Sequence, residues 1–363
     1  MLRRACSAVL VPVVLLLVAV AASPAAAGSN SYHVTKLVSD QAGEAANTDS
    51  NLVNAWGLAA GPTTPWWVAD NETKVSTLYD GSGNGFPSTG PLVVDVPGAP
   101  TGLVFNGGSG FVVSDGTNSG PAKFLFATEA GTIRGWSPAV PPPPLSTQTE
   151  VGKDRSGVGA IYKGLAIAST PDGDRLYAAD FHNGRVDVFD SDFGLVTSPG
   201  AFVDPTLPAR FAPFGIQAIG DAIFVAYAKQ DADREDEVAG RGLGFVDMYD
   251  TSGNILGRVA TRGLLNAPWG LAIAPATFGR FGGDLLVGNF GDGQINAFVQ
   301  RPNGRFEHDG RLRRPNGLPL AIDGLWALQV GNDNAAGSSN SVFFTAGPDD
   351  ETHGLFGRID PAS

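Results

Sequence analysis

The sequence predicts an all-β protein, a six-bladed β-propeller with four-stranded blades. Three observations predict this fold. A short motif returns six times along the chain, each copy is followed by strand-like segments in the same order, and one strand-like segment near the N-terminus is left over to complete the last blade. The 49 glycines and 26 prolines suit many short strands joined by turns, and no helical periodicity competes with this pattern.

The repeated motif is a bulky residue, a glycine and an aliphatic residue, as in Trp56-Gly57-Leu58. Four further copies place their glycines at Gly102, Gly164, Gly215 and Gly270, and the sixth copy, Trp326-Ala327-Leu328, has alanine instead. Successive copies are separated by 45, 62, 51, 55 and 57 residues. A regular period of this size is typical of a repeat architecture, in which each copy begins one blade.

Each copy is the innermost strand of its blade and is followed by a second strand after a loop. The second strands are expected at 66–70, 124–128, 176–180, 223–227, 285–289 and 342–346. A turn then leads to a third, alternating strand, at 74–80, 132–136, 185–190, 244–250, 294–299 and 355–360. Most units carry a fourth candidate, such as 91–96 or 254–260. Runs of this length, with period-two alternation and bounded by Gly, Asn and Asp, indicate β-strands.

The N-terminal segment "YHVTKLV" (32–38) has no unit of its own, and the last unit ends soon after its third strand. We therefore expect this segment to be the outer strand of the last blade, which closes the ring and leaves no half-built edge. Residues 28–363 then form one domain, and 138–157 is a surface excursion within blade two. The expected blades are 54–97, 98–151, 160–210, 211–263, 264–320, and 321–361 completed by 31–39.

Residues 1–27 have the pattern of a secretory signal peptide. Arg3 and Arg4 precede an apolar run from Val9 to Ala22, and small residues at 25–27 offer a cleavage site. A membrane anchor is the alternative, but the run is short for a spanning helix. We expect a secreted or extracytoplasmic protein without a membrane anchor after cleavage. The only cysteine, Cys6, lies in this segment, so the mature chain has neither disulfides nor thiolate metal ligands.

The chain carries a formal net charge of −12 and contains no basic block. Such a charge distribution does not suit a nucleic-acid-binding protein, because nucleic acids are bound by clustered lysines and arginines. We expect a monomer whose ligand, if it has one, is a small molecule or an extracellular polymer. No cofactor is evident in the sequence.

The residues that precede the repeat positions are the first candidates for a binding site. They start the innermost strands, so they are expected to form a ring at one mouth of the central channel. With two nearby asparagines, this set is Asn54, Trp56, Thr101, Lys163, Phe214, Asn266, Trp269 and Trp326. One interpretation is a pocket with aromatic walls and a few polar groups. The other is that the aromatic residues pack between neighbouring blades as core.

Polar residues at the ends of the second strands are the second candidates: Asp70, Asp180 and Asn289. Asp and Asn in such places often accept hydrogen bonds from the following turn. Alternatively, they converge on a channel calcium or a similar divalent ion, which prefers oxygen ligands. No glutamate is found at the equivalent point. His182 and His353 occupy turns that follow second strands, where a histidine is either an exposed turn residue or a general base.

The acidic stretch "KQDADREDEVAGRG" (229–242) interrupts blade four. It lacks the regular alternation of ligands that a calcium-binding loop needs. We expect a solvated loop.

Six segments give the chain a family resemblance: "NAWGL", "WWVAD", "YKGLAI", "NAPWGLA", "LLVGNFGDGQINAF" and "FFTAGPDDETHGLFG". With them it resembles an uncharacterised family of secreted bacterial proteins related to the NHL-type propellers. The resemblance covers nearly all of 32–360. It implies the propeller fold and an extracytoplasmic location, and it implies no activity.

Three classes of function remain compatible with the sequence, which does not choose between an enzyme and a binding protein. The first is a protein that binds a small molecule or an extracellular polymer at the channel mouth. The second is a metal-dependent enzyme, similar to lactonases or lyases, that uses the same face. The third is a protein-interaction scaffold that uses its rim.

Overall fold

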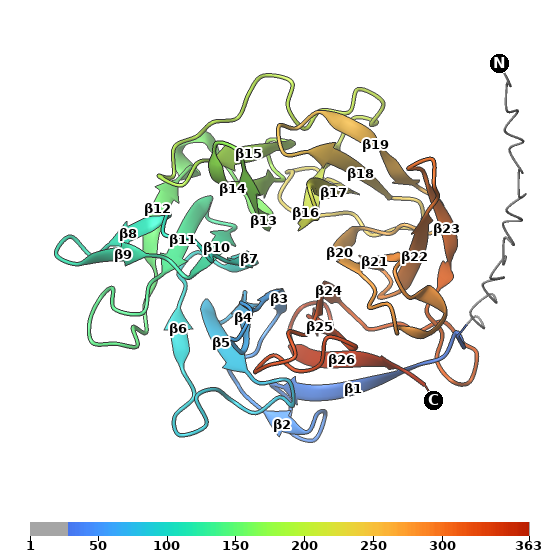
Figure 1. Cartoon of the computed structure of the whole chain (residues 1–363), viewed down its shortest axis with the longest axis horizontal. Coiled ribbons are helices and arrows are strands. Elements are labelled where there is room, and N and C mark those ends of the chain that lie inside the picture. Colours follow the sequence, from blue (N-terminus) through green and yellow to red (C-terminus); the bar gives the residue numbers. More distant parts are fainter. Residues whose placement is uncertain (1–27, 363) are drawn as a thin grey trace, which may run out of the picture.

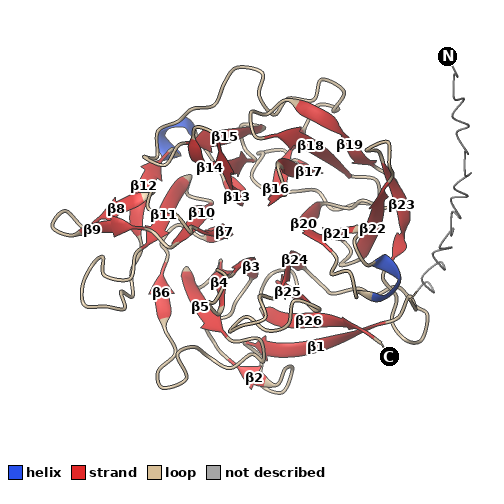
Figure 2. Cartoon of the chain, in the orientation of Figure 1, coloured by secondary structure: helices blue, strands red, loops and turns tan. Residues whose placement is uncertain are grey.

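A computed structural model describes residues 28–362, so the expected signal peptide (1–27) lies outside the described residues. Six sheets surround a central axis (Figure 1), and they are antiparallel except for one short parallel pair of strands in blade six. Apart from two short 3-10 turns, Ser156–Val158 and Gly279–Phe281, the described elements are strands joined by turns and loops (Figure 2). No helix among these residues is long and apolar enough to cross a membrane. The predicted all-β propeller is confirmed.

The first three blades follow one another along the chain. Blade one contains β3 (Ala55–Ala59), β4 (Trp66–Asp70), β5 (Val75–Tyr79) and β6 (Val93–Asp95). Blade two contains β7 (Pro100–Phe105), β10 (Phe124–Thr128), β11 (Thr132–Trp136) and β12 (Glu150–Asp154), with an added hairpin of β8 (Val112–Ser114) and β9 (Ser119–Pro121). Blade three contains β13 (Tyr162–Thr170), β14 (Gly173–Asp180) and β15 (Arg185–Phe189).

The last three blades complete the circle. Blade four contains β16 (Phe211–Ile219), β17 (Ala222–Lys229), β18 (Gly244–Asp250) and β19 (Ile255–Thr261). Blade five contains β20 (Pro268–Ile273), β21 (Leu285–Asn289), β22 (Ile295–Gln300) and β23 (Phe306–Arg311). Blade six contains β24 (Leu325–Val330), β25 (Val342–Ala346) and β26 (Leu355–Pro361), followed by β1 (Tyr32–Ser39) and the short β2 (Asn47–Thr48).

The N-terminal strand closes the ring as predicted. β1 runs antiparallel to β26, from the pair Tyr32 and Pro361 to the pair Ser39 and Leu355. The two ends of the described chain therefore belong to the same sheet, which ties blade six to the start of blade one and protects its edge.

Two blades depart from the simple repeat. Blade three has three strands, because residues 190–210 contain three prolines, which lack the N–H group that a fourth strand would donate. In blade two, the segment predicted as an excursion (138–157) contains a loop and then β12, the outer strand. The long spacing before Gly164 therefore has two sources, this loop and the β8–β9 hairpin.

The repeat glycines allow the innermost strands to approach one another closely. A Cβ atom on Gly57 would lie 2.4 Å from the carbonyl oxygen of Thr101, and one on Gly102 would lie 2.2 Å from the backbone nitrogen of Leu165. Any larger residue would push neighbouring blades apart, which explains why these positions recur as glycine.

One face of the propeller gathers both sets of candidate residues. Ala55 at the start of β3 pairs with Asp70 at the end of β4, and Pro268 at the start of β20 pairs with Asn289 at the end of β21. Because the strands are antiparallel, the starts of the innermost strands and the ends of the second strands lie at the same edge of each blade. We refer to this side as the mouth face.

Candidate functional site

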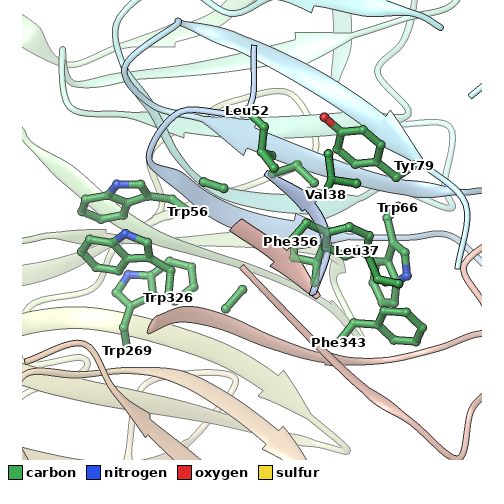
Figure 3. Packing of buried hydrophobic residues seen from close by; sticks show 14 of the residues in the cluster. Leu37, Val38, Leu52, Trp56, Trp66, Tyr79, Trp269, Trp326, Phe343 and Phe356 are labelled. Carbon is green, nitrogen blue, oxygen red and sulfur yellow. The ribbon is translucent and has the colours of Figure 1, made fainter. Parts of the chain in front are cut away.

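Four of the predicted ring residues, Trp56, Phe214, Trp269 and Trp326, meet on the propeller axis and form an aromatic plug. The rings of Trp56 and Trp326 are stacked, with centroids 3.5 Å apart. Trp269 stands nearly perpendicular to both, at 6.2 Å and 5.9 Å. Figure 3 shows the three indoles side by side at one end of the cluster. The two remaining ring members, Thr101 and Lys163, contribute no aromatic side chain.

The plug fills the channel instead of lining a pocket. Trp326 is fully buried and Trp56 is 2% exposed. On the side away from the mouth, the aliphatic residues of the repeat motif leave a cavity of about 20 Å³, which is room for a single water molecule. The interpretation of these aromatic residues as packed core is therefore correct in substance. They pack against one another on the axis rather than between adjacent blades.

Lys163 lies buried against the mouth side of the plug. Its ammonium is 5.2 Å from the centre of the Trp56 ring, and its side chain is 1% exposed. It forms ion pairs with Glu129 and, at 3.0 Å, with Asp236. Burial lowers the pKa of Lys163, but the charges of Glu129 and Asp236 raise this pKa by more, so that it lies above the ordinary value for lysine. The lysine is therefore held in its charged form.

Asn54 connects the plug to a further carboxylate. Its side-chain oxygen accepts a hydrogen bond from Trp326 Nε1 at 3.0 Å, and its amide donates to Glu351 at 2.6 Å. Trp56 and Trp269 also have buried indole N–H groups, and these have no acceptor among residues 28–362. Asn54 thus fixes the orientation of one indole and leaves two others with unused donors.

Four carboxylates interact with the charge of Lys163, and we call them the acidic cluster. Glu129 and Asp236 pair with its ammonium directly, whereas Glu237 and Glu351 act through their charges without a contact. Burial raises the pKa of Glu237 to about 8, although the charge of Lys163 lowers it in part. Burial also raises the pKa of Glu351, against the hydrogen bond from Asn54. Both pKa values are raised mainly by burial, and the charges of the neighbouring carboxylates add to this effect while Lys163 opposes it.

The acidic insertion in blade four supplies two members of this cluster. The amide of Gln230 donates to the carbonyl oxygen of Phe181 at 2.5 Å, and the backbone N–H of Gly240 donates to the side-chain oxygen of Asn266 at 2.6 Å. These contacts hold both ends of the segment across the mouth face. The expectation of a solvated loop agrees with the exposed residues 232–236, 239 and 241, but Gln230 is buried and Glu237 is half-buried.

The polar residues that end the second strands accept hydrogen bonds from backbone N–H groups of their own blades. Asp70 accepts a hydrogen bond from the backbone N–H of Thr77 at 3.0 Å, and Asp180 accepts one from the N–H of Asn183 at 3.2 Å. Asn289 accepts from the N–H of Asn266 at 3.2 Å. Residues 28–362 contain no group of three or more His, Cys, Asp or Glu side chains that could hold a metal, and the convergence of these three residues on one ion stays a prediction.

The residues that reach the axis from the second strands are one position further along the chain. Glu129 contacts Lys163, Phe181 packs on Phe214 at 5.3 Å, and Phe290 stacks on Trp326 at 4.1 Å. Successive side chains of a strand point to opposite sides, so a shift of one residue separates the turn-binding side chains from the axial ones. Glu129 directly follows Thr128 at the end of β10, so its place on the axis depends on a register that the sequence pattern did not reveal.

The two candidate histidines lie apart from each other. The carbonyl oxygen of His182 lies 3.3 Å from the amide nitrogen of Gln230, which places this residue beside the insertion. His353 pairs through Nδ1 with Asp40 at 2.7 Å, at the blade-six edge of the mouth face. Neither contacts the acidic cluster through its side chain.

A separate apolar groove of about 290 Å³ lies between blades one and two, on the side opposite the mouth face. Its aromatic walls come from Trp67, Phe124 and Trp136, with Trp67 and Phe124 stacked at 4.2 Å. Phe86 and Leu145 are exposed at its rim. It shares no residue with the plug.

Solved structures share the propeller fold of this chain, and sequence relatives show its family. No family model matches the chain. Solved structures with the same fold include a streptogramin B lyase (TM-score 0.52, 13% identity, covering 91% of this chain and 98% of that one) and a protein of unknown function from Bacteroides thetaiotaomicron (TM-score 0.55, 10% identity, 91% and 76%). A glucose dehydrogenase has a TM-score of 0.51 at 13% identity, covering 91% and 99%. At these identities the likeness shows the propeller fold alone.

Two relatives in sequence are the uncharacterised proteins R648 and L690 of Acanthamoeba polyphaga mimivirus. Each is 34% identical to this chain, over 335 and 339 residues, which cover 90% of this chain and 80% and 85% of the viral proteins. The chain belongs to the same family as these two proteins. The relatives are viral, so the expectation of a bacterial family is not supported, and secretion stays a prediction.

Proposed function

We propose that this propeller is a binding protein whose mouth face holds a small organic cation. The observation that carries the proposal is the excess of carboxylates over the aromatic plug, four of them interacting with the single charge of Lys163. A second cation would lower the free energy of this cluster, because it would neutralise carboxylates that are already partly removed from water.

Lys163 itself indicates what kind of cation suits the site. Its ammonium lies over the face of Trp56 and between two carboxylates, which is the usual protein environment of an amine. The carboxylates of Glu237 and Glu351 are left without such a partner. They are half-buried rather than sealed, so a ligand can reach them from the mouth face. The chemical class we propose is therefore a primary amine or a guanidine.

The other two classes have unequal support. A metal-dependent enzyme is not favoured, because the described oxygen and nitrogen ligands do not gather as a metal site requires. An interaction scaffold has one observation in its favour, which is the plugged channel together with the exposed apolar groove between blades one and two. A surface of this kind is where partners of a rigid propeller would bind, and we keep it as the second candidate.

The experiment that tests the cation site is isothermal titration calorimetry with 1,5-diaminopentane, using 1,5-pentanediol as the neutral probe of the same length. At pH 7 the diamine should bind and release protons, because Glu237, whose pKa is about 8, must ionise to pair with it. Repeating the titration in two buffers of different ionisation enthalpy measures this release. The diol should not bind.

Variants locate the binding. Glu237→Gln should abolish the proton release and lower the affinity for the diamine about tenfold. This is the change expected when one charge-assisted contact of ~1.4 kcal/mol is lost. Glu307→Gln, in the outer hairpin of blade five, is the matched control and should bind as the parent does. Equal binding of diamine and diol, or a Glu237→Gln variant that binds the diamine unchanged, would refute the proposal.

A further inference from the structure

A cavity away from the plug lies between blades five and six. It has a volume of about 500 Å³ and runs along the outer side of β1. Figure 1 shows β1 as the outermost strand of blade six for most of its length, with β2 beside one end only. The other wall comes from the loop after β23, including Arg314 and Ile322.

The exposed edge of β1 has unused backbone hydrogen-bonding groups. The N–H of Tyr32 donates outward to the carbonyl oxygen of Arg313 at 2.8 Å, and the carbonyl oxygen of Lys36 accepts outward from Ala46 at 3.4 Å. Because alternate residues of a strand direct their backbone groups to the same side, the N–H and C=O of Val34 also point outward. Among residues 28–362 no backbone group pairs with them on that side.

The gap beside Val34 therefore has the geometry of a missing strand of about three residues. Both ends are already satisfied by loops of the protein, and only the middle is open. Unpaired edges of this kind accept extended peptides, whose main chain completes the ladder while flanking pockets read the side chains. An extended tripeptide spans roughly 10 Å, and the cavity has room for it.

The charges along the groove give the peptide a direction. Arg314 and His33 are exposed near the Tyr32 end of β1, whereas Asp323 and Asp349 are exposed at the mouth end. The one remaining lysine, Lys36, is already paired with Glu44 at 3.0 Å. A peptide with a positive N-terminus at the mouth end and a negative C-terminus beside Arg314 would run antiparallel to β1.

We propose that this groove binds a short extended peptide by antiparallel addition to the Val34 edge of β1, with its basic end at Asp323 and Asp349 and its acidic end at Arg314. The central residue of the peptide lies opposite Val34. Its N–H donates to the carbonyl oxygen of Val34, and its C=O accepts from the Val34 N–H. Both hydrogen bonds use backbone groups of Val34 that no other backbone group of the described chain pairs with. Arg314 already donates to the carbonyl oxygen of Ala321 at 2.9 Å, and Asp323 accepts from the N–H of Asp349 at 3.0 Å, so the charge contacts use the remaining donors and acceptors of these side chains.

The test follows the histidine side-chain signals of the protein by NMR during titration with lysyl-valyl-glutamate. His33 lies in the groove and His182 beside the insertion, and a His33→Gln variant assigns the first signal. The peptide should shift the His33 signal and leave that of His182 in place. Its isomer glutamyl-valyl-lysine should bind several-fold more weakly, and the form with N-methylvaline at the centre should bind at least tenfold more weakly.

Arg314→Gln should weaken lysyl-valyl-glutamate at least fivefold, and Arg301→Gln, which changes an exposed arginine of the blade-five hairpin, should not. The proposal is overturned if the peptide leaves the His33 signal unshifted at millimolar concentration, if N-methylation has no effect, or if only the His182 signal moves. This outcome is independent of the mouth-face proposal, because the diamine and the peptide report through different residues.

Discussion

Replacing Lys163 by methionine tests whether the buried ammonium holds the mouth face together. Methionine keeps the length and the contact with Trp56 but removes the charge. The parent lysine is 1% exposed, while its partners Glu129 and Asp236 are 28% and 72% exposed. Loss of the ion pair with Glu129 should therefore account for most of the change in the free energy of unfolding. The pair with Asp236 should contribute only about 0–1 kcal/mol, because Asp236 is exposed.

The expected loss of stability in Lys163→Met follows from these exposed fractions. Removing one partner of a fully buried pair costs about 3–5 kcal/mol, and the partial exposure of Glu129 brings the expected loss to the lower end, about 3 kcal/mol. With ~2.1 cal/mol/K per residue, the 335 residues from 28 to 362 have an unfolding entropy of about 0.7 kcal/mol/K. The expected fall in Tm at pH 8.5 is thus about 4 °C.

The pH dependence of the Tm deficit shows whether Lys163→Met destabilises the protein by removing a charge or by changing the packing. Without Lys163, the pKa of Glu237 rises further, because the charge that lowers it is gone. At pH 4.5 Glu237 and Glu351, whose pKa values are raised, carry less negative charge than at pH 8.5, and the deficit in Tm should shrink to about 1 °C. Differential scanning calorimetry at the two pH values measures this.

The control is Lys36→Met. Lys36 and Glu44 are also 3.0 Å apart, but their side chains are 47% and 54% exposed, so their loss should change Tm by less than 1 °C at either pH. A Lys163→Met variant with an unchanged Tm at pH 8.5, or with the same deficit at both pH values, would show that the reasoning from burial and charge is wrong.

Three further predictions concern stability. Glu237 has a folded-state pKa of about 8, above its ordinary value of 4.5. Between these pH values the folded state binds one more proton than the unfolded state, so stability falls as pH rises from about 5 to 8. Glu237→Gln should therefore flatten the dependence of Tm on pH across this range, and Glu235→Gln should not. Arg258 pairs with both Asp204 and the fully buried Asp247, and burial raises the pKa of Asp247 to about 7. Arg258→Met should lower the free energy of unfolding in urea by about 3–5 kcal/mol at pH 8 and by clearly less at pH 5. A loss that does not depend on pH would contradict this prediction. Trp326→Ala removes the centre of the plug and should cost about 3–5 kcal/mol, with partial recovery of Tm when free indole is added; a loss below 1 kcal/mol would show that the plug is not core.

The fold was predictable because its signals are local and repeated. The glycine of each innermost strand is required by the close approach of the next blade, as Gly57 and Gly102 show, and the same requirement returns in the other blades. The closure of the ring followed from a single unassigned strand, which pairs with β26 as expected. Blade three escaped prediction in part, because the strand that it lacks is replaced by a proline-containing segment with no period of its own.

The candidate site was predictable in position but not in detail. The ring at Trp56, Phe214, Trp269 and Trp326 does lie on the axis, but whether four aromatic residues line a channel or fill it depends on side-chain packing across several blades. The position of Glu129 depended on a one-residue register. The contacts of Asp236 and Glu237 depended on the path of an insertion that has no periodicity from which a path can be inferred.

Two departures from the repeat lie at the mouth face, where we propose that the ligand binds. Thr101 and Lys163 occupy the same repeat position as the four aromatic residues, and they belong to consecutive blades. The Thr101 hydroxyl donates a hydrogen bond to the carbonyl oxygen of Tyr162 at 2.8 Å. Carboxylates from blades two and four pair with Lys163, and the charge of Lys163 also acts on Glu351 of blade six. A plug made only for stability would need no buried ammonium, because apolar residues of similar volume fill such a site at equal or lower cost. The burial of Lys163 beneath excess negative charge is therefore the feature that a purely structural role of the mouth face leaves unexplained.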